Sequence, residues 1–262
     1  MDQLTCVKSV FCSDPSYDPR SGLVDDDMHV IPFEELGPIV VVSPHPDDES
    51  LGCGGLIARC ASLAVPVTVL AMTDGEASHP GDRAWRVELA SIRKREQRNA
   101  LKVLGLVRPD IVSLGLPDGG LHAIEGQMRE RIVALIQDVV QSRMIRSVFV
   151  PAVDDRHDDH RETAMLIAEV VRRCPVEHVF SYQIWPPEKR SARVQANETR
   201  YHHDISDLQP LKQRAIHEHQ SQFAAPDLAH AEGFQIPPDL LEAKLKNKET
   251  YALVSDVSAW SA

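Results

Sequence analysis

Residues 39–55, IVVVSPHPDDESLGCGG, join a short apolar run to a polar turn and then to a glycine-rich stretch. The run from Ile39 to Val42 is wholly apolar and β-branched, which is typical of a parallel strand buried on both faces. Leu51 to Leu63 has the spacing of a helix. The segment therefore predicts a strand–helix unit whose polar turn lies at the carboxyl end of the strand.

The same alternation continues along the chain. Strands that alternate with helices indicate a mainly parallel sheet covered on both faces, so we expect an α/β fold, a Rossmann-like three-layer sandwich. Further strands are predicted at 65–72, 111–114, 147–150, 179–184 and 251–254, and further helices at 84–104, 124–140, 159–173, 207–219 and 240–248.

The domain organisation is predicted to be simple. No linker-like stretch rich in Gly, Ser or Pro interrupts residues 38–222, so we expect a single domain over 38–262. Residues 1–37 have no sustained periodicity and contain the acidic run 25–27, which predicts an irregular N-terminal arm.

Composition excludes several classes of function. The 262 residues contain 28 Lys and Arg against 39 Asp and Glu, a formal net charge of −11. Because phosphate contacts need clustered basic residues, this balance argues against a nucleic-acid partner. The longest apolar runs fall far short of the roughly 20 residues of a membrane-spanning helix.

The cysteines and the first residues bear on the compartment. The five cysteines have no C-x-x-C spacing, which favours reduced thiols over a disulfide framework or a thiolate zinc site. The first residues, MDQLTCVKSVFCSDPSYD, lack the basic start and apolar stretch of a secretory signal. We therefore expect a cytoplasmic protein.

Two clusters of histidines and acids carry the chemistry. PHPDDE at 44–49 follows the first predicted strand, and DDRHDDH at 154–160 follows the strand predicted at 147–150. Ligands of open α/β sheets bind beyond the carboxyl ends of the strands. If the strands are parallel, both clusters share one edge of the sheet, although they are far apart in the sequence.

Imidazole and carboxylate together suit zinc or a similar divalent metal, and three protein ligands with an open position are typical of a catalytic zinc site. Such a metal can lower the pKa of a bound water from about 15.7 to about 7. The adjacent acids Asp47 and Asp48 offer one ligand and one base. A simpler explanation is that acids at a helix N-terminus interact favourably with the helix dipole, by about 0.3–1 kcal/mol each. That explanation leaves His45 and the second cluster unexplained.

The runs VVVSPHPDDESLGCGG and PAVDDRHDDHRETA resemble the LmbE/PIG-L family of zinc-dependent N-deacetylases. The first motif of that family has the form (A/P)HPDDE and the second H-x-D-H, and both occur here in order after the expected strands. The resemblance covers about residues 38–222 and leaves the arm at 1–37 outside it.

Carried over by position, the resemblance implies roles for the residues of both motifs. The metal ligands would be His45, Asp48 and His160. Asp47 would be the general base that takes a proton from the attacking water. His157 would stabilise the oxyanion or protonate the departing amine, and Asp159 would orient a histidine.

Candidates for substrate contact lie outside the two motifs. Arg93 resembles the arginine that contacts substrate in the family, and Arg95 competes with it because the basic segment allows two alignments. Asp118, in a turn after a strand, and His219, near the end of a predicted helix, are further candidates. Trp185 could stack on a sugar ring.

The reaction implied by the resemblance is hydrolysis of an N-acetyl group on an amino sugar, giving acetate and a free amine. The expected cofactor is Zn2+, with Fe2+ or another divalent ion open as alternatives. The expected partner is a small-molecule N-acetylated amino sugar or glycoconjugate, and a homo-oligomer is left open.

Two other functions are weighed against this one. The glycines at 52–55 superficially resemble the cofactor loop of an S-adenosylmethionine-dependent methyltransferase, but the His/Asp motif occupies the turn where that loop would lie. We interpret these glycines as allowing the first helix to pack closely on the sheet. A non-catalytic metal- or sugar-binding module would need neither Asp47 nor His157.

Overall fold

The computed structural model describes residues 28–187, 198–223 and 232–260, and its centre is an eight-stranded sheet in the order β1-β7-β8-β6-β5-β2-β3-β4. The strands are β1 (His29–Val30), β2 (Ile39–Ser43), β3 (Val67–Thr73), β4 (Asp110–Leu116), β5 (Ser147–Pro151), β6 (His178–Tyr182), β7 (Glu198–Asp204) and β8 (Lys248–Val254). The helices are α1 (Asp48–Ser62), α2 (Arg83–Val103), α3 (Gly126–Ser142), α4 (Asp158–Arg173), α6 (Gln209–His217) and α7 (Pro238–Lys244), with short 3-10 turns η2 (Leu121–Ala123), η3 (Gln220–Gln222) and η5 (Val257–Trp260).

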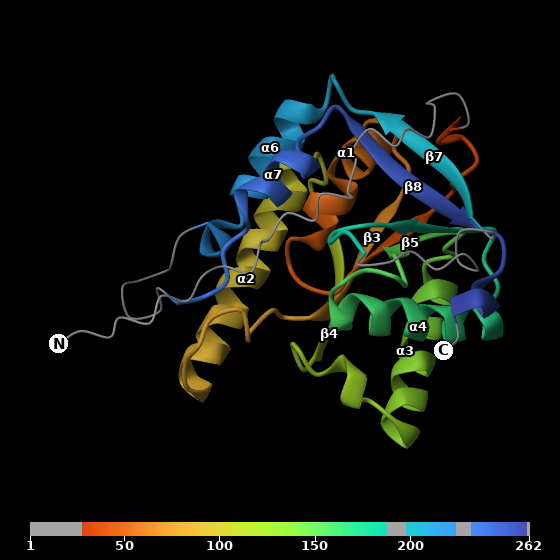
Figure 1. Ribbon diagram of the computed structural model, residues 1–262. Coiled ribbons are helices and arrows are strands. Elements are labelled where there is room, and N and C mark those ends of the chain that lie inside the picture. The colour runs from red at the N-terminus through yellow and green to blue at the C-terminus, as the bar shows by residue number, and fades with distance from the viewer. Residues whose placement is uncertain (1–27, 188–197, 224–231, 261–262) are drawn as a thin grey trace, which may run out of the picture.

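Helices cover both faces of this sheet. Figure 1 shows α1, α2 and α6 on one side and α3 and α4 on the other. Successive side chains of β2 enter opposite cores, with Val41 in the core under α1 and Val42 in the core under α3 and α4. A strand buried on both faces explains the wholly apolar run in the sequence. The predicted three-layer α/β fold is confirmed.

The topology has a switch point beside β2. The chain runs from β2 through β3 to β4 on one side, and then crosses back to β5, which pairs in parallel with the other edge of β2. Open sheets bind ligands at this kind of position, where the strand order reverses, beyond the carboxyl ends of the strands. The two clusters predicted to meet therefore follow adjacent strands.

Two strands differ from the sequence analysis. β7 was not among the predicted strands, because ETRYHHD is polar and pairs near the edge of the sheet with β8 in antiparallel fashion. β1 lies inside the segment 1–37, pairs with β7, and is followed by Ile31 and Leu36, which are buried in the core. Residues 28–37 therefore pack on the domain. A separate arm stays a prediction for residues 1–27, which lie outside the described residues.

The glycines of α1 permit close packing against the sheet. A Cβ on Gly52 would lie 2.4 Å from Cδ2 of Tyr182, and one on Gly55 would lie 2.3 Å from Cγ2 of Ile205. Neither distance is tolerated between real atoms, so any larger residue would push α1 outward. The packing interpretation of this glycine-rich stretch is confirmed.

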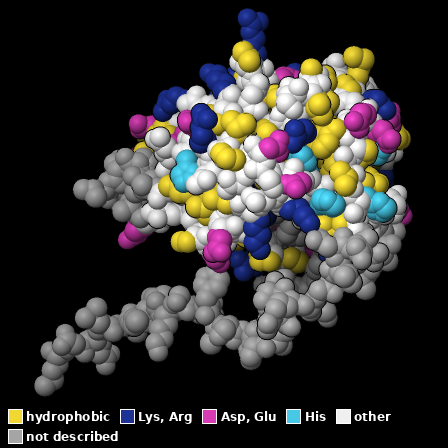
Figure 2. Space-filling view, turned by 90° about the horizontal axis from the view of Figure 1, so that it is seen from above, with side chains coloured by type: hydrophobic (Ala, Val, Ile, Leu, Met, Phe, Trp, Pro, Cys, Tyr) yellow, Lys and Arg dark blue, Asp and Glu magenta, His cyan; other side chains and the backbone are white. Residues whose placement is uncertain are grey.

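The charged surface and the helices add two observations. On the face of the described residues that Figure 2 shows, acidic and basic side chains are interspersed and are not gathered by sign. Within the part of the chain that the structure describes, no helix combines the length and apolar character needed to cross a membrane.

The buried carboxylate of Glu249 in β8 fixes α1 to the sheet and forms an ion pair with Lys212 of α6. The carboxylate of Glu249 accepts hydrogen bonds from the backbone N–H groups of Gly55 and Leu56, both at 2.8 Å. The ammonium of Lys212 donates to the same carboxylate at 2.6 Å, and the hydroxyl of Tyr251 donates to it at 2.7 Å. Burial raises the pKa of Glu249, but Lys212 and these hydrogen bonds outweigh that effect, so the net pKa is lowered.

We predict that Glu249→Ala lowers the free energy of unfolding by about 3–5 kcal/mol, because it leaves the ammonium of Lys212 buried without its counter-ion. Urea denaturation measures this change. The double variant Glu249→Gln, Lys212→Met should recover part of the loss, since it removes both charges together. If Glu249→Ala lowered the free energy of unfolding by less than about 1 kcal/mol, Glu249 would not be what holds α1 to β8.

The same pair sets a pH dependence. A carboxylate with a lowered pKa in the folded state stabilises the fold above its unfolded pKa, about 4.3 for Glu, and the stabilisation is lost as pH falls through the folded pKa. We therefore expect the stability of the wild-type protein to fall below about pH 4.3, and to fall less steeply in Glu249→Ala.

Candidate metal centre

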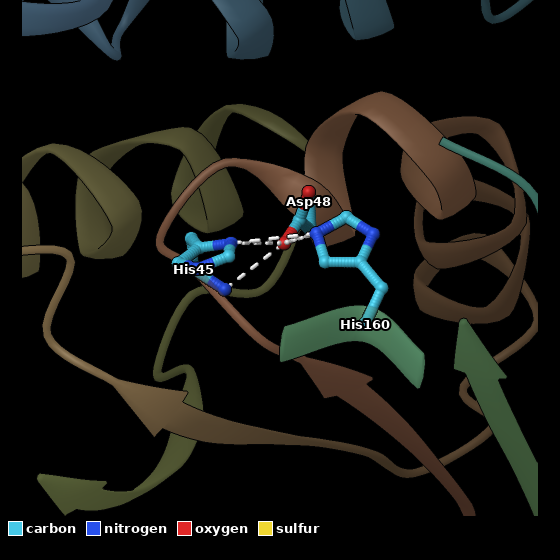
Figure 3. Close-up of side chains that lie close together, drawn as sticks. All are labelled: His45, Asp48 and His160. Carbon is cyan, nitrogen blue, oxygen red and sulfur yellow. Dashed lines mark hydrogen bonds and ion pairs between the residues drawn. The ribbon is translucent and has the colours of Figure 1, made fainter. Parts of the chain in front are cut away.

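Three potential ligands meet where β2 and β5 end. His45 lies in the turn after β2, Asp48 is the first residue of α1, and His160 lies in the first turn of α4. Figure 3 shows their side chains converging. Oδ2 of Asp48 lies 3.2 Å from Nδ1 of His45 and 3.2 Å from Nε2 of His160, and these two ring nitrogens are 3.4 Å apart.

This donor set fits a divalent metal ion. One ligand atom from each residue lies within 4.8 Å of the others, and two imidazoles with one carboxylate suit zinc and similar cations. The second nitrogen of His45, Nε2, faces carboxylates instead, at 3.2 Å from both Asp118 and Asp159. A ligating imidazole whose other nitrogen meets a carboxylate is the usual arrangement around protein-bound metals.

A cavity of about 320 Å³ opens beside these residues. One part of its lining is polar and includes the metal group, and another part is apolar and aromatic. Trp185 and Phe234 meet edge to face there, with ring centroids 6.2 Å apart. The residues lining the cavity are His45, Asp47, Asp48, Leu51, Ala77, Ser78, Arg93, Asp118, Gly119, His157, His160, Ile184, Trp185, Gln222, Phe234 and Leu240.

Asp47 lies beside the metal group in an unusual backbone conformation. Its φ of 148° falls in the region that favours glycine, and it immediately precedes α1. Its backbone N–H donates to the buried carboxylate of Glu49 at 3.3 Å. Burial raises the pKa of the Asp47 carboxyl to about 7, against the opposing effect of the Arg93 guanidinium. A base with a pKa near neutrality suits proton transfer at physiological pH.

Arg93 of α2 holds Asp47 in place. Arg93 is 2% exposed, and its guanidinium donates to the carbonyls of Gly75 and Pro46, both at 2.9 Å, and to Oδ2 of Asp47 at 3.2 Å. Arg95, two residues along the helix, is exposed. The structure therefore places Arg93, and not Arg95, at the site.

The hydrogen bonding of His157 determines which of its ring nitrogens carries the proton. It is the N-cap residue of α4, and its Nδ1 accepts a hydrogen bond from the backbone N–H of Asp159 at 3.2 Å. The neutral ring therefore carries its proton on Nε2. Burial, followed by the positive charge of His45, lowers the pKa of His157, which favours this neutral form. His157 can thus donate a hydrogen bond into the cavity.

The chain is similar to known proteins over most of its length. The family described as PIG-L, GlcNAc-PI de-N-acetylase, matches residues 40–171. A probable N-acetyl-alpha-D-glucosaminyl L-malate deacetylase 2 of Bacillus cereus is 30% identical over 223 residues, which cover 82% of this chain and 92% of that protein. The chain belongs to the PIG-L family.

Further relatives are similar over most of their length. The diacetylchitobiose deacetylase of Thermococcus kodakarensis is 27% identical over 198 residues, covering 73% of this chain and 72% of that protein. Among solved structures, the N,N'-diacetylchitobiose deacetylase of Pyrococcus horikoshii superposes with a TM-score of 0.64 at 23% identity, covering 86% of each chain. That structural likeness supports the α/β fold.

In this PIG-L chain the predicted site residues lie together, with one exception. Asp118 lines the cavity and accepts from the backbone N–H of Ala77 at 2.7 Å, and Asp159 accepts from that of Gly119 at 2.7 Å. Burial raises the pKa of Asp118, but hydrogen bonding to His45, the positive charges of His45 and Arg93 and the backbone N–H of Ala77 together outweigh burial and lower that pKa to about 2. The cavity side therefore presents ionised carboxylates around His45.

His219 is the exception. It is fully buried behind the N-terminus of α1, where its Nε2 lies 3.1 Å from the hydroxyl of Ser50. Burial lowers its pKa to about 3, so the ring is neutral. His219 is not among the described residues that line the cavity, whereas Gln222 of η3 is. The 3-10 turn after α6 redirects the chain, so helical spacing did not predict which side chain reaches the cavity.

Other residues of the site were not singled out from the sequence. Glu49 is fully buried and accepts from Ser43 at 2.8 Å and from Gln97 at 3.0 Å, so it anchors the turn from β2 into α1. Asp155 lies inside the second acidic cluster, and its place in that cluster was the signal in the sequence that could have marked it. Phe234 reaches the cavity from a distant loop, and no sequence pattern marked it.

We predict that Arg93→Met raises the pKa of Asp47 above its value of about 7, because the guanidinium is the group that lowers it most. A carboxyl ¹³C NMR titration of Asp47 in the metal-free protein measures this shift. Lys94→Met, on the same helix but exposed, is the matched control and should leave the titration unchanged. An unaltered Asp47 titration in Arg93→Met would contradict the assignment.

Proposed function

We propose that this protein is a metal-dependent hydrolase, with zinc as its metal, that removes an N-acetyl group from an amino-sugar-containing small molecule. The observation that carries the proposal is Asp47. The carboxylate of Asp47 is not part of the metal group but lies beside that group in the cavity. Asp47 is 5% exposed, and its pKa is raised to about 7. Binding a metal requires no such group, whereas activating a water does.

The names of the relatives support the choice of substrate class. Those reported above are described as deacetylases of diacetylchitobiose and of an N-acetylglucosaminyl malate. The cavity also suits a sugar, because the rings of Trp185 and Phe234 line it together with polar groups. Arg93 and Asp118 line the same cavity as proposed substrate contacts.

His45, Asp48 and His160 would hold the zinc ion. When bound, zinc supplies a Lewis acid that polarises the amide carbonyl and makes a nearby water easier to deprotonate. Arg93 holds the carboxylate of Asp47 in position, and Asp47 accepts the proton of the attacking water. Asp159 accepts the N–H of His45 and thereby keeps the opposite ring nitrogen available as a ligand.

The remaining steps use the protons already in place. The water oxygen adds to the amide carbon, and Nε2–H of His157 donates to the developing oxyanion. Loss of one such donor typically slows a reaction by about 10²–10³. The C–N bond then breaks, the proton taken by Asp47 passes to the amine nitrogen, and acetate and a free amine leave.

The proposed compartment is the cytoplasm. Cys53 and Cys60 are free thiols buried in the core, and burial raises the pKa of each. Unpaired buried cysteines are typical of proteins in a reducing compartment.

Amine release from N-acetylated sugars tests the proposal. A panel of N-acetylglucosamine, N,N'-diacetylchitobiose and N-acetylglucosaminyl malate would be incubated with zinc-loaded protein, with and without a chelator. We expect release from at least one compound, lost on chelation. His45→Ala should lose both zinc and activity, since it removes a ligand.

Asp47→Asn separates catalysis from metal binding. This variant should keep stoichiometric zinc and lose activity by about 10²-fold or more, because it cannot accept a proton. Asp207→Asn, an exposed acid paired with Arg59, is the control and should retain wild-type rates. Full activity in Asp47→Asn would remove Asp47 from the role of base.

A further inference from the structure

Asp155 lies in the loop between β5 and α4 and is completely buried. It is neither one of the three proposed zinc ligands nor a residue lining the cavity. A buried carboxylate is costly unless several donors satisfy it. The groups that donate hydrogen bonds to Asp155 therefore show which parts of the structure it holds together.

One oxygen of Asp155 holds the aromatic wall of the cavity. Oδ2 accepts from the backbone N–H of Ile184 at 3.0 Å and from that of Trp185 at 2.9 Å. The side-chain amide of Gln183 donates to the same oxygen at 3.2 Å. The segment after β6 that carries Trp185 is thus tied to this single atom.

The other oxygen faces the histidines of the second motif. Oδ1 accepts from the backbone N–H of His157 at 3.0 Å and lies 3.4 Å from Nδ1 of His160. Nε2 of His160 points the other way, toward Asp48 and His45. A proton on Nδ1 would leave the lone pair of Nε2 directed at the metal group.

We propose that Asp155 is a positioning residue with two linked effects. It keeps the proton of His160 on Nδ1, which leaves Nε2 free to bind zinc, and it fixes the Trp185 wall in the same frame as that ligand. The proposal rests on the proposed zinc site. Metal affinity and substrate affinity are therefore joined through one buried carboxylate.

Asp155→Asn tests the first effect. An asparagine offers one acceptor oxygen and one NH₂ group. Its oxygen is expected on the wall side, where three donors meet it, so that the NH₂ group faces His160 and favours the tautomer protonated on Nε2. Loss of such a carboxylate partner typically weakens metal binding 10–100-fold, and we expect a change of about that size.

Zinc affinity is measured by competition with a chromophoric chelator, and KM by amine release. In Asp155→Asn we expect weaker zinc binding and a KM, at saturating zinc, within about twofold of wild type, because the wall keeps its acceptor. In Asp155→Ala both change: zinc binds more weakly, and KM rises about fivefold, as expected when a hydrogen bond holding the wall is lost.

Two controls isolate the effects. Asp158→Asn, an exposed acid in the same acidic cluster that pairs with Arg161, should leave zinc affinity and KM unchanged. Trp185→Ala should raise KM while zinc affinity stays at the wild-type value. Unchanged zinc affinity in folded Asp155→Asn, or unchanged KM in folded Asp155→Ala, would overturn the proposal.

A measurement on the wild-type protein does not depend on whether the variants fold. In the zinc-loaded wild-type protein, ¹⁵N NMR of the histidine rings should show His160 protonated at Nδ1, with its ring signals assigned through bonds to its own backbone resonances. A proton on Nε2 would overturn the proposal. The zinc-affinity and NMR measurements need no substrate, so a failed substrate screen with these two results intact would count against the proposed reaction alone.

Discussion

The parallel pairing of β2 with β5 is the constraint on which the site depends. Ile39 pairs with Ser147 and Val41 with Phe149, so the two strands end at the same edge of the sheet. The chain reaches β5 only after building β3 and β4 on the other side of β2. This reversal of strand order leaves the carboxyl ends of β2 and β5 side by side, and α1 and α4 start there. Both motifs are delivered to one point because the backbone ladder holds these strands together.

Buried carboxylates then hold the delivered residues in position. Glu249 fixes α1 from β8, Glu49 anchors the turn that contains Asp47, and Asp155 joins the second motif to the cavity wall. Each accepts hydrogen bonds from backbone N–H groups, which offset the cost of burying the charge. Part of the acid excess in the composition therefore serves internal structure. These buried carboxylates hold in place the turns that carry the proposed metal ligands.

Much of the fold and of the site could be predicted from the sequence, because local patterns carried it. The β-branched run at 39–42 marked a doubly buried strand, and the two His/Asp clusters marked strand ends. Helix starts were less well predicted: α1 begins at Asp48, within the motif. β7 was missed because its polar residues show no apolar run. His219 was a candidate from the sequence but does not line the cavity, whereas Gln222 does, because a 3-10 turn redirects the chain after α6. Phe234 reaches the cavity through a contact that local sequence does not encode.

By itself, the sequence determined the strand–helix alternation, the acidic and histidine motifs and their order, because these depend on neighbours within a few residues. Only the tertiary structure decided which atoms face one another. It placed Nδ1 of His45 and Nε2 of His160 around one oxygen of Asp48. It brought Arg93, and not Arg95, into contact with Asp47. It also set Asp155 between the proposed ligand His160 and the cavity wall at Trp185. Those choices depend on side chains from separate strands and helices packing around one point, and spacing along the chain carries no information about such contacts.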